Sequence, residues 1–123
     1  MLLKLVRQGL GRLIIFGDWA SRPRPIKRNN QAQKLVNEAA AGLSLYQFYA
    51  CPFCVKVRRT IHKLNVPIEL RDAQGNSQFR QELEQQGGRI KVPCLRIEDA
   101  EGVRWMYESN DINNYLNQRF SDI

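Results

Sequence analysis

One stretch determines how the rest of this chain is interpreted: residues 43–54 read Leu-Ser-Leu-Tyr-Gln-Phe-Tyr-Ala-Cys-Pro-Phe-Cys. An apolar run leads into two cysteines that are separated by two residues, and an amphipathic basic stretch follows from Val55 to Leu64. This order predicts a strand, then Cys-x-x-Cys, then a helix that begins at the first sulfur. Free backbone N–H groups at a helix N-terminus favour the thiolate form of Cys51, the form that attacks disulfides. Lys56, Arg58 and Arg59 add positive charge nearby.

The charge of the chain is unevenly distributed. The whole chain has 123 residues and a formal net charge of +7, and its length fits one domain with at most an appendage. Residues 1–43 hold eight Lys/Arg against Asp18 and Glu38, whereas residues 44–123 hold eleven against ten acidic residues. The positive charge therefore belongs to the N-terminal segment, and we expect no nucleic-acid partner.

The cysteine content favours redox chemistry over a disulfide framework or a metal site. Three cysteines cannot all pair, and two of them have a redox spacing, so we expect a reducing, cytoplasmic compartment. Zinc needs about four ligands, and the remaining candidates are Cys94 and His62. His62 lies too far along the helix from Cys51, at about 16 Å of rise, to share a metal with it. We expect no metal, and we expect Cys94 to fill the core.

The N-terminal segment is expected to form an amphipathic basic helix over residues 1–20. Charged residues interrupt the apolar run, so it does not suit a membrane span, and no clear cleavage site marks it as an export signal. Its apolar residues follow helical spacing: Leu2, Leu3, Val6, Leu10, Leu13, Ile14 and Gly17. We expect residues 1–28 to lie peripherally on the cytoplasmic face of a membrane, held by anionic lipids. The alternative is that this helix packs on the domain or on a partner.

The rest of the chain divides into a basic linker with a short helix over residues 21–42 and a folded domain over residues 43–123. Within the domain we expect strands at 43–49, 66–70, 92–97 and 103–107, and helices at 51–65, 77–86 and from a capping Ser109 onward. The first two strands should be parallel, joined by a right-handed crossover. The turn at 98–102 is short enough that the last two strands must be antiparallel. The pattern predicts an α/β fold, a mixed four-stranded sheet with helices on both faces.

Three separated pieces carry a resemblance to the glutaredoxin branch of the thioredoxin superfamily over residues 43–120: Cys51-Pro52-Phe53-Cys54, Val92-Pro93 and Glu108-Ser109. The Glu-Ser pair looks more like the N-terminal domain of glutathione transferases, and like the glutaredoxin-type domain of membrane-associated prostaglandin E synthase. The resemblance implies a thioredoxin-like (glutaredoxin) fold, to which the N-terminal amphipathic helix is added.

The resemblance also implies roles for named residues. Cys51 would be the nucleophile and Cys54 the resolving thiol. Pro93 would be cis, which leaves the Val92 backbone free to pair with the substrate as an added strand would. Glu108 and Ser109 would hold the γ-glutamyl end of glutathione, with its carboxylate at a helix N-terminus.

These roles predict a monomeric, glutathione-dependent thiol–disulfide oxidoreductase that acts on glutathionylated or disulfide-bonded proteins. Two alternatives remain open: a glutaredoxin dimer that binds an iron–sulfur cluster, and a membrane-associated glutathione-dependent transferase or isomerase. Many glutaredoxins carry a lysine where this chain has Phe48, and that lysine meets a carboxylate of glutathione. Lys91, Arg89 and Lys56 are the candidates to replace it.

Overall fold

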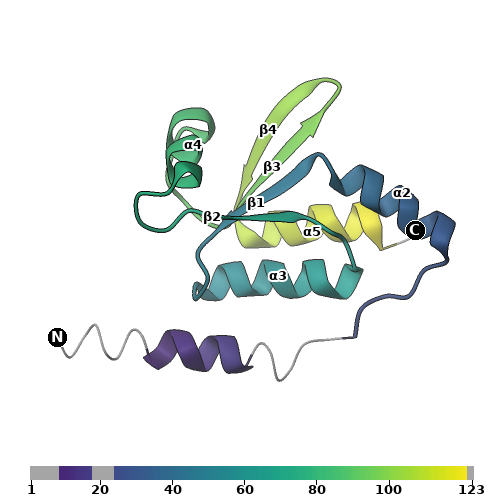
Figure 1. Cartoon of the computed structure of the whole chain (residues 1–123), viewed down its shortest axis with the longest axis horizontal. Coiled ribbons are helices and arrows are strands. Elements are labelled where there is room, and N and C mark those ends of the chain that lie inside the picture. The colour runs from purple at the N-terminus through teal and green to yellow at the C-terminus, as the bar shows by residue number, and fades with distance from the viewer. Residues whose placement is uncertain (1–8, 18–23, 122–123) are drawn as a thin grey trace.

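The computed structural model describes residues 9–17 and 24–121, and a four-stranded sheet forms its centre (Figure 1). The strand order is β2-β1-β3-β4. β1 pairs in parallel with β2 and antiparallel with β3, and β3 pairs antiparallel with β4. The predicted mixed sheet is therefore confirmed. The strands are β1 (Leu43–Gln47), β2 (Glu69–Asp72), β3 (Cys94–Asp99) and β4 (Gly102–Tyr107).

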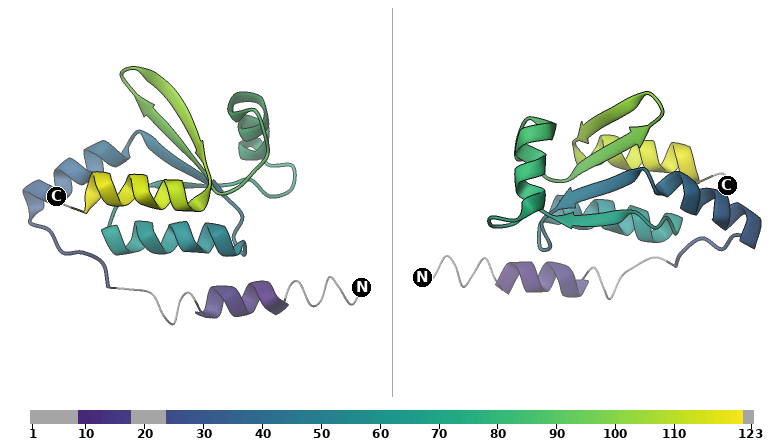
Figure 2. Two further views of the ribbon diagram at one scale, coloured as in Figure 1. Left: turned by 180° about the vertical axis from the view of Figure 1, so that it is seen from behind. Right: turned by 45° about the horizontal axis from the view of Figure 1, so that its top comes forward.

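Helices cover both faces of this sheet, as the thioredoxin-like prediction requires. The helices are α2 (Asn30–Ala40), α3 (Pro52–Leu64), α4 (Gln78–Gly87) and α5 (Ser109–Phe120). Two of them, α3 and α5, run side by side on one face, and α4 lies on the other (Figures 1 and 2). A further helical stretch at 9–17 lies beside α3, on the side away from the sheet (Figure 2).

The sheet separates two hydrophobic clusters because successive side chains of a strand point to opposite faces. Leu45 and Leu95 face α3 and α5 and belong to the larger cluster. Their neighbours Tyr46 and Cys94 face α4 and belong to the smaller one. Cys94 is fully buried there, so the prediction that it fills the core is confirmed.

α2 belongs to the body of the domain. Its Val36 and Ala40 are buried in the larger cluster, together with Phe120 of α5. Gly42 follows the helix, and a Cβ atom there would lie 2.3 Å from the carbonyl oxygen of Glu98, so this close approach of two backbones requires glycine. The division into 1–20, 21–42 and 43–123 stays a prediction.

Some predicted boundaries were wrong, and proline explains two of them. β2 begins at Glu69 rather than at residue 66, and β3 begins at Cys94 rather than at residue 92. Pro67 and Pro93 precede these starts, and proline has no N–H to give to a strand ladder. The last helix also differs, because Ser109 is its first helical residue and Glu108 occupies the cap position with φ 73.

Part of the predicted N-terminal helix is present. Residues 9–17 are helical, whereas residues 1–8 and 18–20 lie outside the described residues. Among the helices that the structure describes, none has the length and apolar content needed to cross a membrane.

Candidate active site

The strand register brings the three sequence motifs to the same end of the sheet, where β1 and β4 finish and β3 begins. Cys94 pairs with Tyr46 of β1 on one side and with Tyr107 of β4 on the other. The loop after β1 carries Cys51, the residue before Cys94 is Pro93, and the residue after Tyr107 is Glu108. Motifs that lie far apart in the sequence therefore meet in space.

Cys51 caps α3 and is partly exposed. Its backbone has φ −72 and ψ 125, and its carbonyl oxygen accepts the N–H of Val55 at 2.9 Å. Its own N–H donates to the carbonyl oxygen of Phe48 at 3.3 Å. The thiol therefore sits in a tight turn at the start of α3, as the sequence predicted.

Arg58 holds the loop that carries Cys51. Its guanidinium donates to the carbonyl oxygen of Phe48 at 3.2 Å, to the carbonyl oxygen of Tyr49 and to the side chain of Gln47. It also lies 5.6 Å from the centre of the Tyr49 ring. Sequence reasoning treated Arg58 only as a nearby positive charge, and its role in positioning the loop became visible only in three dimensions.

Cys54 is fully buried one helical turn beyond Cys51. The N–H of Phe48 donates to its sulfur at 3.4 Å. Burial raises the pKa of Cys54 to about 12; the Phe48 N–H opposes this rise, and the charge and hydrogen bond of Cys51 add to it. None of the three cysteines forms a disulfide bond with another. At neutral pH Cys54 therefore keeps its proton. Because Cys54 is buried and Cys51 is partly exposed, Cys51 is the residue of the pair that a substrate can reach.

The peptide bond between Val92 and Pro93 is cis, as the resemblance implied. Pro93 is buried directly before β3, and Val92 is half-buried. Val92 packs against the smaller cluster, and so does Phe48 from the loop before Cys51. The residue that replaces the glutaredoxin lysine is thus part of the apolar wall on this side of the site.

Glu108 and Ser109 lie at the N-terminus of α5. Ser109 is only 8% exposed, whereas the side chain of Glu108 is 60% exposed and pairs with Lys91. The hydrogen bond from Lys91, together with its charge, lowers the pKa of Glu108, and Arg89 contributes a smaller effect. Glu108 is therefore an ionised carboxylate beside a cation at the edge of the site.

The three cations proposed to replace the missing lysine occupy different places. Lys91 lies next to Val92 and contacts Glu108. Lys56 donates to the side chain of Asn110 and so joins α3 to the first turn of α5. Arg89 lies 4.4 Å from the centre of the Tyr107 ring. Lys91 is thus the cation in direct contact with the Glu-Ser motif.

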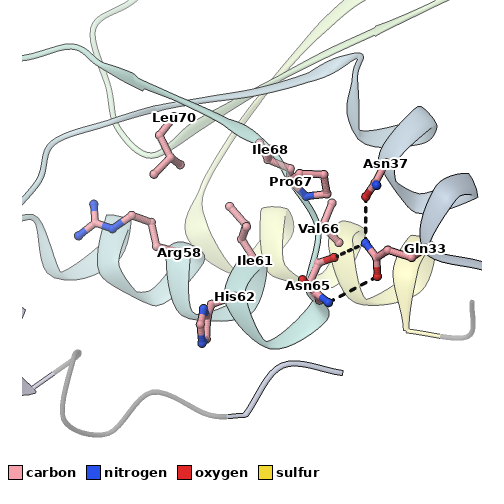
Figure 3. A pocket seen from close by; sticks show the side chains of 10 residues that line it. All are labelled: Gln33, Asn37, Arg58, Ile61, His62, Asn65, Val66, Pro67, Ile68 and Leu70. Atoms are coloured by element: carbon pink, nitrogen blue, oxygen red, sulfur yellow. Dashed lines mark hydrogen bonds between the residues drawn. The ribbon is translucent and has the colours of Figure 1, made fainter. Parts of the chain in front are cut away.

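A pocket of about 540 Å³ lies away from the two thiols, between α2, α3 and β2 (Figure 3). Apolar side chains such as Ile61 and Leu70 line it. At its rim, Gln33 bonds to Asn37 at 2.9 Å and to the carbonyl oxygen of Asn65 at 3.0 Å. These polar groups form hydrogen bonds with one another, and we propose no ligand or reaction for the pocket. Among the residues that the structure describes, no group of three or more His, Cys, Asp or Glu could hold a metal ion.

The chain belongs to the glutathione S-transferase N-terminal domain family, whose model matches residues 45–122. This match covers the thioredoxin-like part of the chain. It agrees with the resemblance to glutathione transferases, whereas membership of the glutaredoxin branch stays a prediction. The chain is 28% identical to prostaglandin E synthase 2 of Mus musculus over 98 residues, which are 80% of this chain and 25% of that protein. The chain thus spans about a quarter of the length of this relative.

Solved structures show the same fold. Maleylacetoacetate isomerase from Anaeromyxobacter dehalogenans 2CP-1, with glutathione bound in its active site, is similar with a TM-score of 0.52 and 21% identity, over 65% of this chain and 38% of that one. The tau class glutathione S-transferase of mango, Mangifera indica, is similar with a TM-score of 0.54 and 23% identity, over 68% of this chain and 36% of that one.

Proposed function

We propose that this protein is a glutathione-dependent thiol–disulfide oxidoreductase that reduces protein disulfides or glutathione mixed disulfides through Cys51. One observation carries the proposal: Cys51 is partly exposed at the N-cap position of α3, and its partner Cys54 is fully buried with a pKa raised to about 12. This asymmetry suits one attacking sulfur and one protected sulfur.

The reaction would proceed in two exchanges. The Cys51 thiolate attacks the glutathione sulfur of a glutathionylated protein, the original S–S bond breaks, and the protein thiolate leaves and takes up a proton. A mixed disulfide between Cys51 and glutathione remains. A second glutathione thiolate then attacks the bound glutathione sulfur, which forms oxidised glutathione and restores Cys51. For a protein disulfide, Cys54 would release the substrate after losing its proton.

Glutathione would be held by the motifs that surround Cys51. The Val92 backbone before cis Pro93 would pair with its cysteinyl backbone. Glu108 would meet the γ-glutamyl amine, and Ser109 with the N-terminus of α5 would receive the neighbouring carboxylate. Lys91 would contact the second carboxylate in place of the lysine that Phe48 replaces. A maleylacetoacetate isomerase of the same fold holds glutathione in its active site, which supports glutathione as the ligand.

The test is the reduction of a mixed disulfide between glutathione and a model protein. We expect Cys51→Ser to abolish the reaction and Ser109→Ala to raise the KM for glutathione about tenfold, because a hydrogen bond to a charged group is lost. Ser121→Ala, at the exposed end of α5, is the matched control and should leave KM unchanged. Turnover by the Cys51→Ser variant would contradict the proposal.

A second candidate is a glutathione-dependent transferase or isomerase. The observation that favours it is the apolar character of the residues around Cys51: Tyr49 is 60% exposed and Phe53 is 62% exposed, and Phe48 replaces a lysine. Such surroundings suit an apolar electrophile. Conjugation of glutathione to a small apolar electrophile, without any reduction of mixed disulfides, would favour this candidate over the oxidoreductase.

A further inference from the structure

One face of the molecule concentrates positive charge. It is formed by the helical stretch 9–17, the segment 24–29 and α3, and we call it the basic face. These three segments contain no acidic residue. Exposed cations come from each of them: Arg12, Arg24, Lys27, Lys56 and Lys63. The domain is therefore strongly polarised, although residues 44–123 are nearly neutral in sum.

The helical stretch 9–17 is the outermost layer of the basic face, and it is apolar on both sides. Gly11 is buried, and a Cβ atom there would lie 3.0 Å from the Cβ of Ala50, so this side of the helix faces the domain. Leu13 points the other way at 3.6 residues per turn. The outer side carries large exposed side chains, with Leu10 55%, Leu13 66% and Phe16 64% exposed.

We propose that the basic face docks on an anionic lipid bilayer, with Leu10, Leu13 and Phe16 entering the interface. The exposed apolar side chains would enter the hydrocarbon boundary of the bilayer, and the surrounding cations would contact its anionic headgroups. A nucleic acid would use the cations but leave the leucines in water. In this arrangement one helix packs on the domain through the side that carries Gly11 and presents the exposed Leu10 and Leu13 on its outer side.

Docking in this orientation would bring the candidate active site to the membrane surface. The residue that contacts Gly11 is Ala50, the neighbour of Cys51. Tyr49 and Phe53, which flank Cys51, are also large exposed apolar side chains. The substrates of Cys51 would then include thiols and disulfides of membrane-bound proteins or amphiphiles. These substrates rest on the proposed function, whereas the docking itself does not.

The experiment is co-sedimentation of the full chain with vesicles of phosphatidylcholine, with and without phosphatidylserine. We expect the chain to bind the vesicles that contain phosphatidylserine. Binding of Leu13→Asp should be at least about tenfold weaker, because an apolar side chain is removed from the interface and the anionic lipids repel the new carboxylate. The matched control is Leu35→Asp in α2, where the leucine is similarly exposed at 60% but lies off the basic face. Arg12→Gln should weaken binding about fivefold.

Three results would overturn the docking proposal. The first is sedimentation of Leu13→Asp equal to that of the unchanged chain, and the second is an equal loss of binding in both aspartate variants. The third is competition of double-stranded DNA with vesicles while Leu13→Asp binds that DNA as well as the unchanged chain does. The rate at which Leu13→Asp reduces a soluble mixed disulfide is measured independently of vesicle binding, and it shows whether the variant is still active. Unchanged turnover with lost sedimentation supports docking, and absent turnover in the unchanged chain counts against the proposed function alone.

Discussion

Cys54 lies one helical turn from Cys51 and differs from it in access to water. Because Cys54 is buried with a pKa of about 12, it keeps its proton when glutathione is the reductant. We expect Cys54→Ser to reduce glutathione mixed disulfides at a rate within about threefold of the unchanged chain, which corresponds to about 0.65 kcal/mol in the barrier. The rate of reduction of a glutathionylated model protein measures this. A complete loss of turnover would show that Cys54 is needed in every cycle.

Buried titratable groups also predict how stability changes with pH. Burial raises the pKa of Cys54 and of Cys94 from 9.0 to about 12, and burial with the hydrogen bond to Glu82 raises that of Tyr46 from 10.0 to about 12. The unfolded chain therefore loses these protons first. The stability they contribute is fully present below about pH 9 and is lost as pH rises toward 12.

The free energy of unfolding in urea, measured as a function of pH, tests this prediction. We expect it to fall between pH 9 and 12, and to fall less steeply in Cys94→Ala, which lacks one of the three groups. A flat or rising curve in this range would contradict the burial of these side chains.

At the residue scale, the sequence predicted those parts of the site that lie in short motifs. Cys51 at a helix start and the cis bond before Pro93 follow from two or three consecutive residues and the family resemblance. The contacts of Lys91 with Glu108 and of Arg58 with the Phe48 loop were missed. They join residues 17 and 10 positions apart, and no local pattern indicates which long cation folds back.

At the scale of elements, α4 is attached to the sheet by a polar network as well as by apolar packing. Tyr46 of β1 donates its hydroxyl hydrogen to Glu82 of α4 at 2.6 Å and accepts from Arg71 of β2 at 2.7 Å. Arg71 also bonds to Glu82 at 3.0 Å and lies over the Tyr46 ring. The network therefore joins two strands and a helix across the smaller cluster.

We expect Tyr46→Phe to lower the free energy of unfolding by about 1–2 kcal/mol, because a buried hydroxyl with two partners is lost while the ring is kept. Tyr115→Phe is the matched control, since its hydroxyl accepts from Arg119 at the exposed surface of α5. That change should cost less than about 0.5 kcal/mol. Equal effects in urea unfolding would show that the network contributes nothing to stability.

Element types were predicted better than element boundaries. Apolar alternation and helical spacing identified every strand and helix between residues 30 and 121. The starts of β2 and β3 were placed too early because apolar Val66 and Val92 continue the pattern, whereas Pro67 and Pro93 interrupt the ladder. The cap of α5 was assigned to Ser109 by residue preference, and the positive φ of Glu108 could not be read from the sequence.

At the scale of the whole molecule, the segment 24–29 fastens the N-terminal part of the chain to the domain. The N–H of Ile26 donates to the carbonyl oxygen of Lys63 at 2.9 Å, and Arg28 donates to the carbonyl oxygen of Phe120 at 2.9 Å. Asn65 also donates to the carbonyl oxygen of Ile26 at 3.3 Å. The segment that the sequence predicted as a linker therefore contributes to the fold.

Two deletions test this view. Removal of residues 1–28 should lower the free energy of unfolding by about 2–4 kcal/mol, since several hydrogen bonds to α3 and α5 are lost. Removal of residues 1–17 keeps these bonds and should cost about 1 kcal/mol or less. Urea unfolding of both chains gives the comparison, and equal losses would contradict the fastening role of 24–29.

Charge at this scale was only partly visible in the sequence. The excess in residues 1–43 was evident, but sums over segments hid the polarity of the domain, because the cations of α3 are offset by acidic residues on other faces. The two-sided helix at 9–17 was likewise read as having one apolar face, since spacing does not tell which side a glycine presents to a neighbour.

The proposed reaction depends on Cys51 forming a disulfide with glutathione, and intact-protein mass spectrometry of Cys54→Ser tests this directly. After incubation with oxidised glutathione, we expect one adduct per chain, located on Cys51 by peptide mapping and absent from a Cys51→Ser/Cys54→Ser chain. An unmodified Cys51, or an adduct found on Cys94 instead, would contradict the proposed reaction.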